Sequence, residues 1–149
     1  MHDIVIRKGK KSDLPVLKRL LVELINAMDD TACIDMRVAP KHWEQLFRDA
    51  RSHFLVATAG GTPVGLIHLT IRQTVLHRSP SGMIDELIVT NEYQGKGIGK
   101  QLVLAAIDRC RQLGCCEVEV STEQTNLKAR RFYRKCGFVK EEILFELDL

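Results

Sequence analysis

The sequence lacks the features that mark several specialised classes of protein. It contains no run of about 18 apolar residues, the length that a membrane-spanning helix needs. Residues 1–7 lack the basic region and long apolar stretch of a signal peptide. No internal repeat, linker or low-complexity tract occurs in the 149 residues. We therefore expect a cytoplasmic protein with one domain over residues 1–149 and no membrane partner.

Cysteine usage and net charge exclude further classes. The five cysteines are odd in number, form no Cys-x-x-Cys pair and include the adjacent Cys115 and Cys116, so we expect neither disulfides nor a metal site. The net charge of only +3 gives no case for nucleic acid as a partner, which would require a concentrated basic face. With 45% hydrophobic residues, the composition is that of a globular domain.

Hydrophobic spacing predicts the element order β-α-α-β-β-β-α-β-α-β. Strands are expected at residues 4–7, 54–59, 64–76, 83–89, 117–120 and 138–149. Helices are expected from the N-cap Ser12 to Met28, from Pro40 to Ala50, from the glycine-rich segment to Gly114, and from Asn126 to Cys136. This order indicates one α+β domain with a mixed sheet and helices on both of its faces.

A glycine-rich segment, Gln94-Gly95-Lys96-Gly97-Ile98-Gly99, joins an expected strand to an expected helix. Glycine lets a ligand approach the backbone, because no Cβ stands in the way. The first amides of a helix are unpaired and carry partial positive charge, so they form an anion site. Lys96 and Lys100 add cationic side chains nearby.

The segment does not match two common nucleotide-binding loops. A P-loop would require glycine at Gln94 and serine or threonine at Gln101. The dinucleotide fingerprint would require glycine at Lys100 or at Leu102.

The segment instead resembles the main signature of the GCN5-related N-acetyltransferase (GNAT) family, Gln/Arg-x-x-Gly-x-Gly/Ala directly after a strand. Here the strand ends in Leu87-Ile88-Val89. A second signature, Asn126-Leu127-Lys128-Ala129-Arg130-Arg131-Phe132-Tyr133, is followed by Gly137-Phe138. The resemblance also covers the element order of the whole chain. It implies a sheet of about six to seven mostly antiparallel strands flanked by four helices and splayed between the fourth and fifth strands.

The resemblance implies how a donor, acetyl-CoA, would be held without any metal. The amides of Gln94, Gly95, Lys96, Gly97, Ile98, Gly99 and Lys100 would bind the pyrophosphate of coenzyme A. The pantetheine arm would lie along Leu87, Ile88 and Val89 in the splay and pair with backbone groups of Leu87 and Val89. Asn126 would hydrogen-bond this arm, cap its own helix, or do both.

The resemblance also implies the chemistry, a direct transfer through a tetrahedral intermediate. Tyr133 matches the family tyrosine that protonates the departing thiolate and contacts the coenzyme. Asp85 and Glu86 stand where relatives place an acidic residue that faces the acceptor amine. Because successive strand residues point to opposite faces, we expect only one of the two carboxylates to reach the site.

The acceptor is expected to be a primary amine of a small molecule. The stretch from Val120 to Leu149 looks like members that acetylate aminoalkylphosphonates and polyamines. Acetylation of protein N-termini or lysines, and a non-catalytic acyl-CoA sensor, are the alternatives. His68 and His77 are further candidate bases, and the residues Asp29, Asp30, Asp35 and Glu44 are candidates for the acceptor pocket. Phe145, Leu147 and Leu149 would permit a homodimer.

Overall fold

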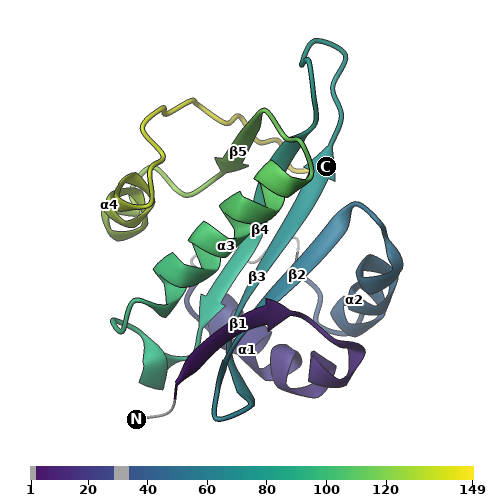
Figure 1. The fold of residues 1–149 in the computed structure, drawn as a ribbon, viewed down its shortest axis with the longest axis vertical. Helices are drawn as coiled ribbons and strands as arrows, with labels where there is room; N and C mark the ends of the chain where they lie inside the picture. The colour runs from purple at the N-terminus through teal and green to yellow at the C-terminus, as the bar shows by residue number, and fades with distance from the viewer. Residues whose placement is uncertain (1–2, 29–33) are drawn as a thin grey trace.

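A computed structural model describes residues 3–28 and 34–149, and its centre is a single sheet of five strands (Figure 1). The sheet order is β1-β2-β3-β4-β5, so neighbours in sequence are neighbours in space. Its strands are β1 Ile4–Lys8, β2 Ser52–Ala59, β3 Thr62–Arg72, β4 Ser81–Val89 and β5 Glu117–Val120. The first four strands pair antiparallel, and β5 pairs parallel to β4. The expected mixed, mostly antiparallel sheet is confirmed.

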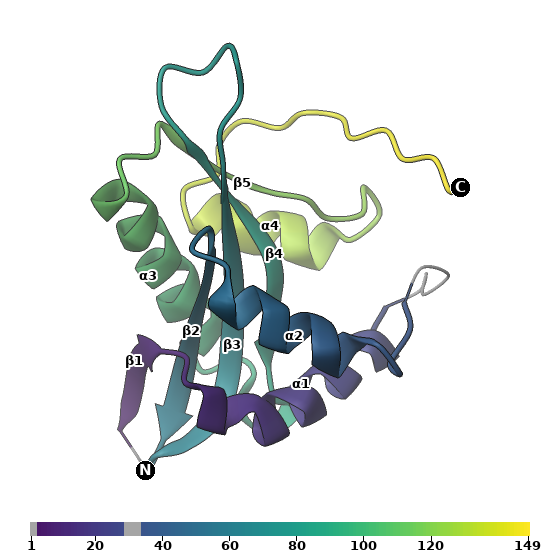
Figure 2. The same ribbon diagram turned by 90° about the vertical axis from the view of Figure 1, so that its right-hand side faces the viewer.

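Four α-helices accompany the sheet, and three of them cover its two faces (Figure 2). Their bounds are α1 Leu14–Asn26, α2 Ala39–Arg48, α3 Ile98–Gln112 and α4 Leu127–Lys135. On one face α3 packs its buried residues, including Leu102 and Val103, against β3 and β4. On the other face α1 and α2 pack Leu17, Leu20 and Trp43 against the sheet. The sheet therefore divides two hydrophobic cores.

A β-bulge in β4 determines which core each of its residues enters. His68 of β3 pairs with Glu86 and Leu69 pairs with Ile84, so Asp85 is an extra residue without a partner on β3. In a regular strand Ile84 and Ile88 would share a face. Here Ile84 is buried in the core under α3, whereas Ile88 is buried in the core under α1 and α2. The bulge therefore reverses the face on which residues after Asp85 lie.

The splay between β4 and β5 is confirmed. The two strands pair only from Ser81–Glu117 to Ile84–Val120, while β4 continues to Val89. Within the described part of the chain, the second half of β4 thus has β3 on one side and no strand partner on the other.

The prediction of a sixth strand at residues 138–149 is wrong. Residues 138–149 form no strand and run away from the sheet (Figure 2). Phe145 and Leu147 are almost fully exposed. Alternating apolar residues favour a strand only where a neighbour can pair with its backbone, and β5 offers an edge of just four residues. The sheet has five strands instead of the expected six to seven.

Two smaller boundaries also differ from the prediction. Residues Lys11–Asp13 form a short 3₁₀ helix, and the Asp13 carboxylate accepts the Lys10 amide, so Ser12 is not the N-cap. The third strand ends at Arg72, so His77 lies in the loop that follows it.

Among residues 3–28 and 34–149, no helix is long and apolar enough to cross a membrane. The four cysteines in these ranges, Cys110, Cys115, Cys116 and Cys136, have free thiols. Cys33 lies outside the described residues.

Replacing Gly82 by alanine should test the packing of α3 on β4. A Cβ at Gly82 would collide with the Cys110 sulfur, and overpacking of this kind costs about 1–3 kcal/mol. We expect Gly82→Ala to lower Tm by several degrees in a thermal melt. Adding Cys110→Ala removes the sulfur, so the double variant should be more stable than the sum of the two single effects. Strict additivity would contradict this contact.

Candidate active site

The glycine-rich turn places an open backbone directly before α3. Gly95 and Gly97 have φ angles of 74° and 79°, the left-handed region that glycine adopts without strain. A Cβ built on either residue would meet no atom within 4 Å. Gly99 is closer to its neighbours, because its Cβ would lie 3.5 Å from the Phe132 ring. Two of the three glycines therefore border free space.

The N-terminus of α3 presents unpaired amides to this space. The first helical bond is donated by Gln101 to the Gly97 carbonyl at 3.1 Å, so the amides of Ile98, Gly99 and Lys100 lack helical partners. Lys100 is exposed, and the Lys96 ammonium lies 4.7 Å from the centre of the Tyr93 ring. Together, the helix end and the two lysines favour an anionic ligand.

The backbone of β4 faces the splay at alternate residues. The Thr90 amide donates to the Val64 carbonyl of β3 at 3.0 Å, so the backbone groups of Thr90 point toward β3. By alternation, Ile88 faces β3, whereas Leu87 and Val89 turn their amides and carbonyls toward the splay. The Gln94 side chain confirms this direction by donating to the Val89 carbonyl at 3.0 Å.

Two side chains hold the start of the turn, and one of them, Glu23, carried no signal in the sequence. Glu23 of α1 accepts the Thr90 hydroxyl at 3.0 Å and the Asn91 amide at 3.2 Å, across 67 and 68 positions of sequence. Gln94 also donates to the Asn91 side chain at 3.1 Å. These bonds tie α1 to the loop between β4 and the glycines.

Asp85 and Glu86 lie on the same side of the sheet, which corrects the expectation that only one would reach the site. Glu86 Oε2 is 2.6 Å from His68 Nδ1, and Asp85 Oδ2 is 4.0 Å from the same nitrogen. The Thr70 hydroxyl donates to Asp85 at 2.6 Å. Strand alternation fails here because the bulge gives Asp85 and Glu86 a shared face.

The two carboxylates stand where β5 leaves β4, immediately after Ile84. Their side chains are 33% and 40% exposed, so both can be reached from solvent. Partial burial raises the pKa of Asp85 above its usual range, although Thr70 and His68 oppose this effect. A carboxylate with a raised pKa accepts a proton more readily near neutral pH.

Tyr133 lies on the other face of the sheet from the carboxylates. Its ring packs edge-on against Phe132 and Phe138 and joins the core under α3. Burial, with a smaller contribution from Cys136, raises the pKa of Tyr133 to about 12. The phenol is therefore protonated at neutral pH and can donate its proton.

Asn126 is the N-cap of α4, because its side chain accepts the Ala129 amide at 3.0 Å. The capping half of the expected role is confirmed, and contact with a coenzyme stays a prediction.

The remaining candidates are more peripheral. His77 is bonded to Glu117 at 2.9 Å, Asp35 is paired with Arg37, and Glu44 is exposed on α2. Asp29 and Asp30 lie outside the described residues. Among the candidates within residues 3–28 and 34–149, the structure therefore brings Asp85, Glu86 and His68 together.

An anion-binding helix end beside a splayed strand pair is the arrangement that the resemblance predicts. A sequence profile of the acetyltransferase (GNAT) family matches residues 21–138. The chain belongs to the GNAT acetyltransferase family. It is therefore an acyltransferase of this family, and the resemblance seen in the sequence is confirmed.

Individual GNAT relatives cover most of the chain. An uncharacterised N-acetyltransferase of Archaeoglobus fulgidus is 30% identical over 129 residues, which are 86% of this chain and 88% of the relative. The aminoalkylphosphonate N-acetyltransferase of Salmonella typhimurium is 33% identical over 65% of this chain and 63% of its own length. The structure of the aminoglycoside N-acetyltransferase AAC(6')-Iy in complex with CoA superposes with a TM-score of 0.84. It covers 99% of this chain and 96% of its own at 20% identity, which shows a shared fold.

The protonation of Tyr133 can be measured without any substrate. The chain has two tyrosines, so ¹³C-labelled tyrosine gives two ring signals, and a Tyr133→Phe variant assigns them. We expect the Tyr133 signal to stay at its neutral position up to pH ~10, where an ordinary tyrosine is half ionised. Half ionisation of Tyr133 near pH ~10 would contradict its burial.

Proposed function

We propose that this GNAT protein transfers the acetyl group of acetyl-CoA to a primary amine of a small molecule. The observation that carries the proposal is the row of unpaired amides at the N-terminus of α3, which opens onto free space above Gly95 and Gly97. The splay of β4 from β5 lies next to that row.

The donor half of the proposal is that these backbone groups bind coenzyme A. The amides from Gln94 to Lys100 would hold the pyrophosphate, with Lys96 and Lys100 adding positive charge. The backbone groups of Leu87 and Val89 would pair with the amide-bearing pantetheine arm, much as a strand edge binds an extended peptide. When bound, acetyl-CoA supplies the acetyl group as an activated thioester.

The acceptor half depends on the two carboxylates. An amine attacks only when it is neutral, so an ammonium substrate must first lose a proton. We assign binding of the ammonium and acceptance of its proton to Asp85 and Glu86. On the other face of β4, Tyr133 would donate the proton that the departing thiolate needs.

Two relatives support a small acceptor. The aminoalkylphosphonate N-acetyltransferase and a second relative, an aminoglycoside N(6')-acetyltransferase of Stenotrophomonas maltophilia that is 29% identical over 64% of this chain and 66% of its own length, are both named for small molecules that carry amines. A carboxylate pair suits such cationic amines, since each carboxylate can accept a charge-assisted hydrogen bond from an ammonium.

Alanine at Gly97 should separate coenzyme binding from folding. An L-residue at a positive φ costs about 1–2 kcal/mol, and here its Cβ would also enter the space assigned to the pyrophosphate. We expect at least tenfold weaker CoA binding by calorimetry, which corresponds to about 1.4 kcal/mol.

Gly114→Ala is the matched control, because Gly114 has a φ of 74° and open space at the other end of α3. It should lose similar stability and bind CoA normally. Equal CoA affinity in both variants would exclude the turn as the pyrophosphate site.

Turnover tests the reaction itself. Acetyl-CoA would be incubated with an aminoalkylphosphonate, an aminoglycoside, a polyamine and a peptide with a free N-terminus, while release of the CoA thiol is followed. We expect release above the hydrolysis background with at least one small amine. Tyr133→Phe should lower kcat by about tenfold or more and change CoA affinity much less, because a positioned acid acts in the transition state.

Acetylation of the peptide alone would contradict the small-molecule assignment. Tight CoA binding without release above background for any amine would favour a sensor over an enzyme.

A further inference from the structure

Three polar side chains form a continuous hydrogen-bonded row behind the carboxylates. Ser52 Oγ lies 2.6 Å from His68 Nε2, and His68 Nδ1 lies 2.6 Å from Glu86 Oε2. The row crosses three neighbouring strands, from the start of β2 through β3 to the bulge of β4. Only 4% of the surface of His68 is exposed, so its ring acts through the side chains around it and not on a substrate directly.

The direction of these hydrogen bonds follows from the groups involved. An ionised carboxylate only accepts hydrogen bonds, so His68 Nδ1 must carry the proton that Glu86 accepts. In a neutral imidazole the other nitrogen is then an acceptor, so the Ser52 hydroxyl must donate to Nε2. Each donor in the row therefore fixes the orientation of the next.

The imidazole is held in place by aromatic stacking. Its ring lies parallel to Phe54, with 4.3 Å between ring centres, and Phe54 stacks in turn on Phe47 at 4.4 Å. Rotation of the ring would break both the stack and the two hydrogen bonds. The stack and the two hydrogen bonds therefore fix the orientation of the ring.

The two carboxylates next to His68 are held differently. Asp85 Oδ2 is bonded to Thr70 and is 4.0 Å from His68 Nδ1, which is beyond hydrogen-bonding distance. Glu86 uses Oε2 for His68, and among the described residues nothing bonds its Oε1. Glu86 thus keeps one oxygen available while the other is anchored.

We propose that Ser52 and His68 are positioning residues for Glu86. Ser52 anchors His68 at Nε2, and His68 holds Glu86 with Oε1 free for the acceptor ammonium. This role rests on the proposed acetyl transfer to an amine. Without the Ser52 donor, the buried Nε2 loses this hydrogen bond, and Glu86 is the remaining hydrogen-bonded anchor of the ring.

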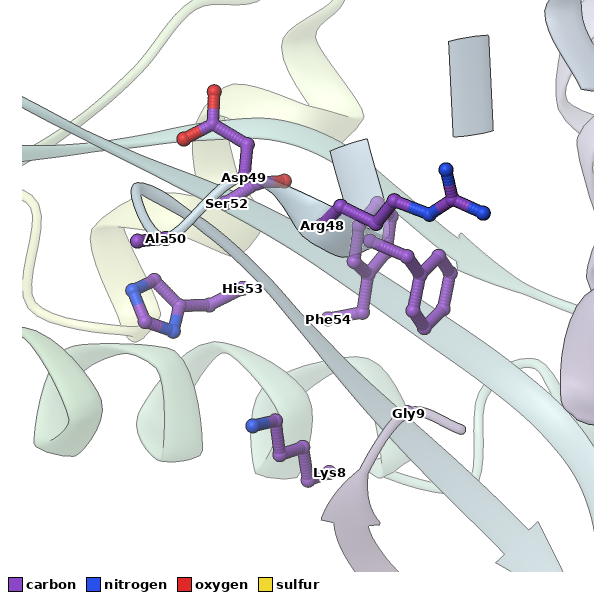
Figure 3. Close-up of a pocket in the computed structure, with 9 residues that line it drawn as sticks. Lys8, Gly9, Arg48, Asp49, Ala50, Ser52, His53 and Phe54 are labelled. Carbon is purple, nitrogen blue, oxygen red and sulfur yellow. The ribbon is translucent and has the colours of Figure 1, made fainter. Parts of the chain in front are cut away.

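The order serine, histidine, carboxylate also occurs in serine hydrolases, where the serine is a nucleophile. Ser52 borders a surface hollow of about 170 Å³ with Phe47, Arg48 and His53 (Figure 3). Its own amide, however, donates to the Asp49 carbonyl at 3.0 Å and is not available for an oxyanion. The geometry therefore favours a positioning role over nucleophilic attack.

Valine and threonine at Ser52 form a matched pair, because the two side chains have the same shape and differ in the hydroxyl. Valine also fills the space in which a water molecule could replace the serine. The five histidines would be ¹⁵N-labelled, and His68 would be assigned by loss of its signals in His68→Gln. We expect ¹⁵N NMR to show protonated Nδ1 in the wild type and in Ser52→Thr. In Ser52→Val the proton should stay on Nδ1, and the ¹⁵N signal of Nε2 should move toward the position of an imidazole nitrogen that accepts no hydrogen bond.

The kinetic measurement uses the small amine that gives the highest turnover. We expect Ser52→Val to lower kcat by about tenfold, because a misplaced base loses part of the 10²–10⁴ that positioning provides. Ser52→Thr should keep at least half of the wild-type kcat. CoA affinity should be equal in all three proteins.

The possible failures can be told apart. If the wild type binds no CoA, the proposed acetyl transfer fails, and the NMR result alone still decides whether Ser52 donates to His68. If the wild type turns over and Ser52→Val has the same kcat or the same Nε2 signal, the positioning role is overturned. Labelling of Ser52 by a fluorophosphonate would also overturn it, since that result would identify Ser52 as a nucleophile.

Discussion

The structure depends most on the single extra residue in β4. Asp85 has no partner on β3, and this bulge turns the rest of the strand over. Ile84 thereby enters the core under α3, and Ile88 enters the core under α1 and α2. The same turn puts both carboxylates beside His68. The bulge also lies at the point where β5 separates from β4. The packing of β4, the position of its carboxylates and the start of the splay are therefore all set at one residue.

The geometry of the proposed donor half of the site could be predicted from the sequence because its causes are local. Gly95 and Gly97 adopt positive φ angles that few other residues tolerate, and a helix start exposes its amides whatever surrounds it. Asn126 caps α4 through an amide three residues away. The helices, and the five strands that form, follow from hydrophobic spacing within short windows. Such features do not require knowledge of distant contacts.

The acceptor half could not be predicted in the same way, because its causes are distant in sequence. Alternation along β4 would separate Asp85 from Glu86, and only the pairing with β3 reveals the bulge. Ser52 is 16 positions from His68, and Glu23 is 67 positions from Thr90. The strand expected at residues 138–149 failed for a related reason, since its alternating pattern says nothing about whether a partner strand is available.

The arrangement of acid and base on opposite faces of β4 fits a direct transfer. In the proposed reaction the thioester lies in the splay, so Tyr133 approaches it from the α3 side and the amine approaches from the side of Asp85 and Glu86. Burial raises the pKa of both Tyr133 and Asp85. For Asp85 this strengthens the carboxylate as a proton acceptor in its proposed role. A higher pKa makes a phenol a weaker acid, so the proposed proton donation by Tyr133 must depend on its position and not on its acidity.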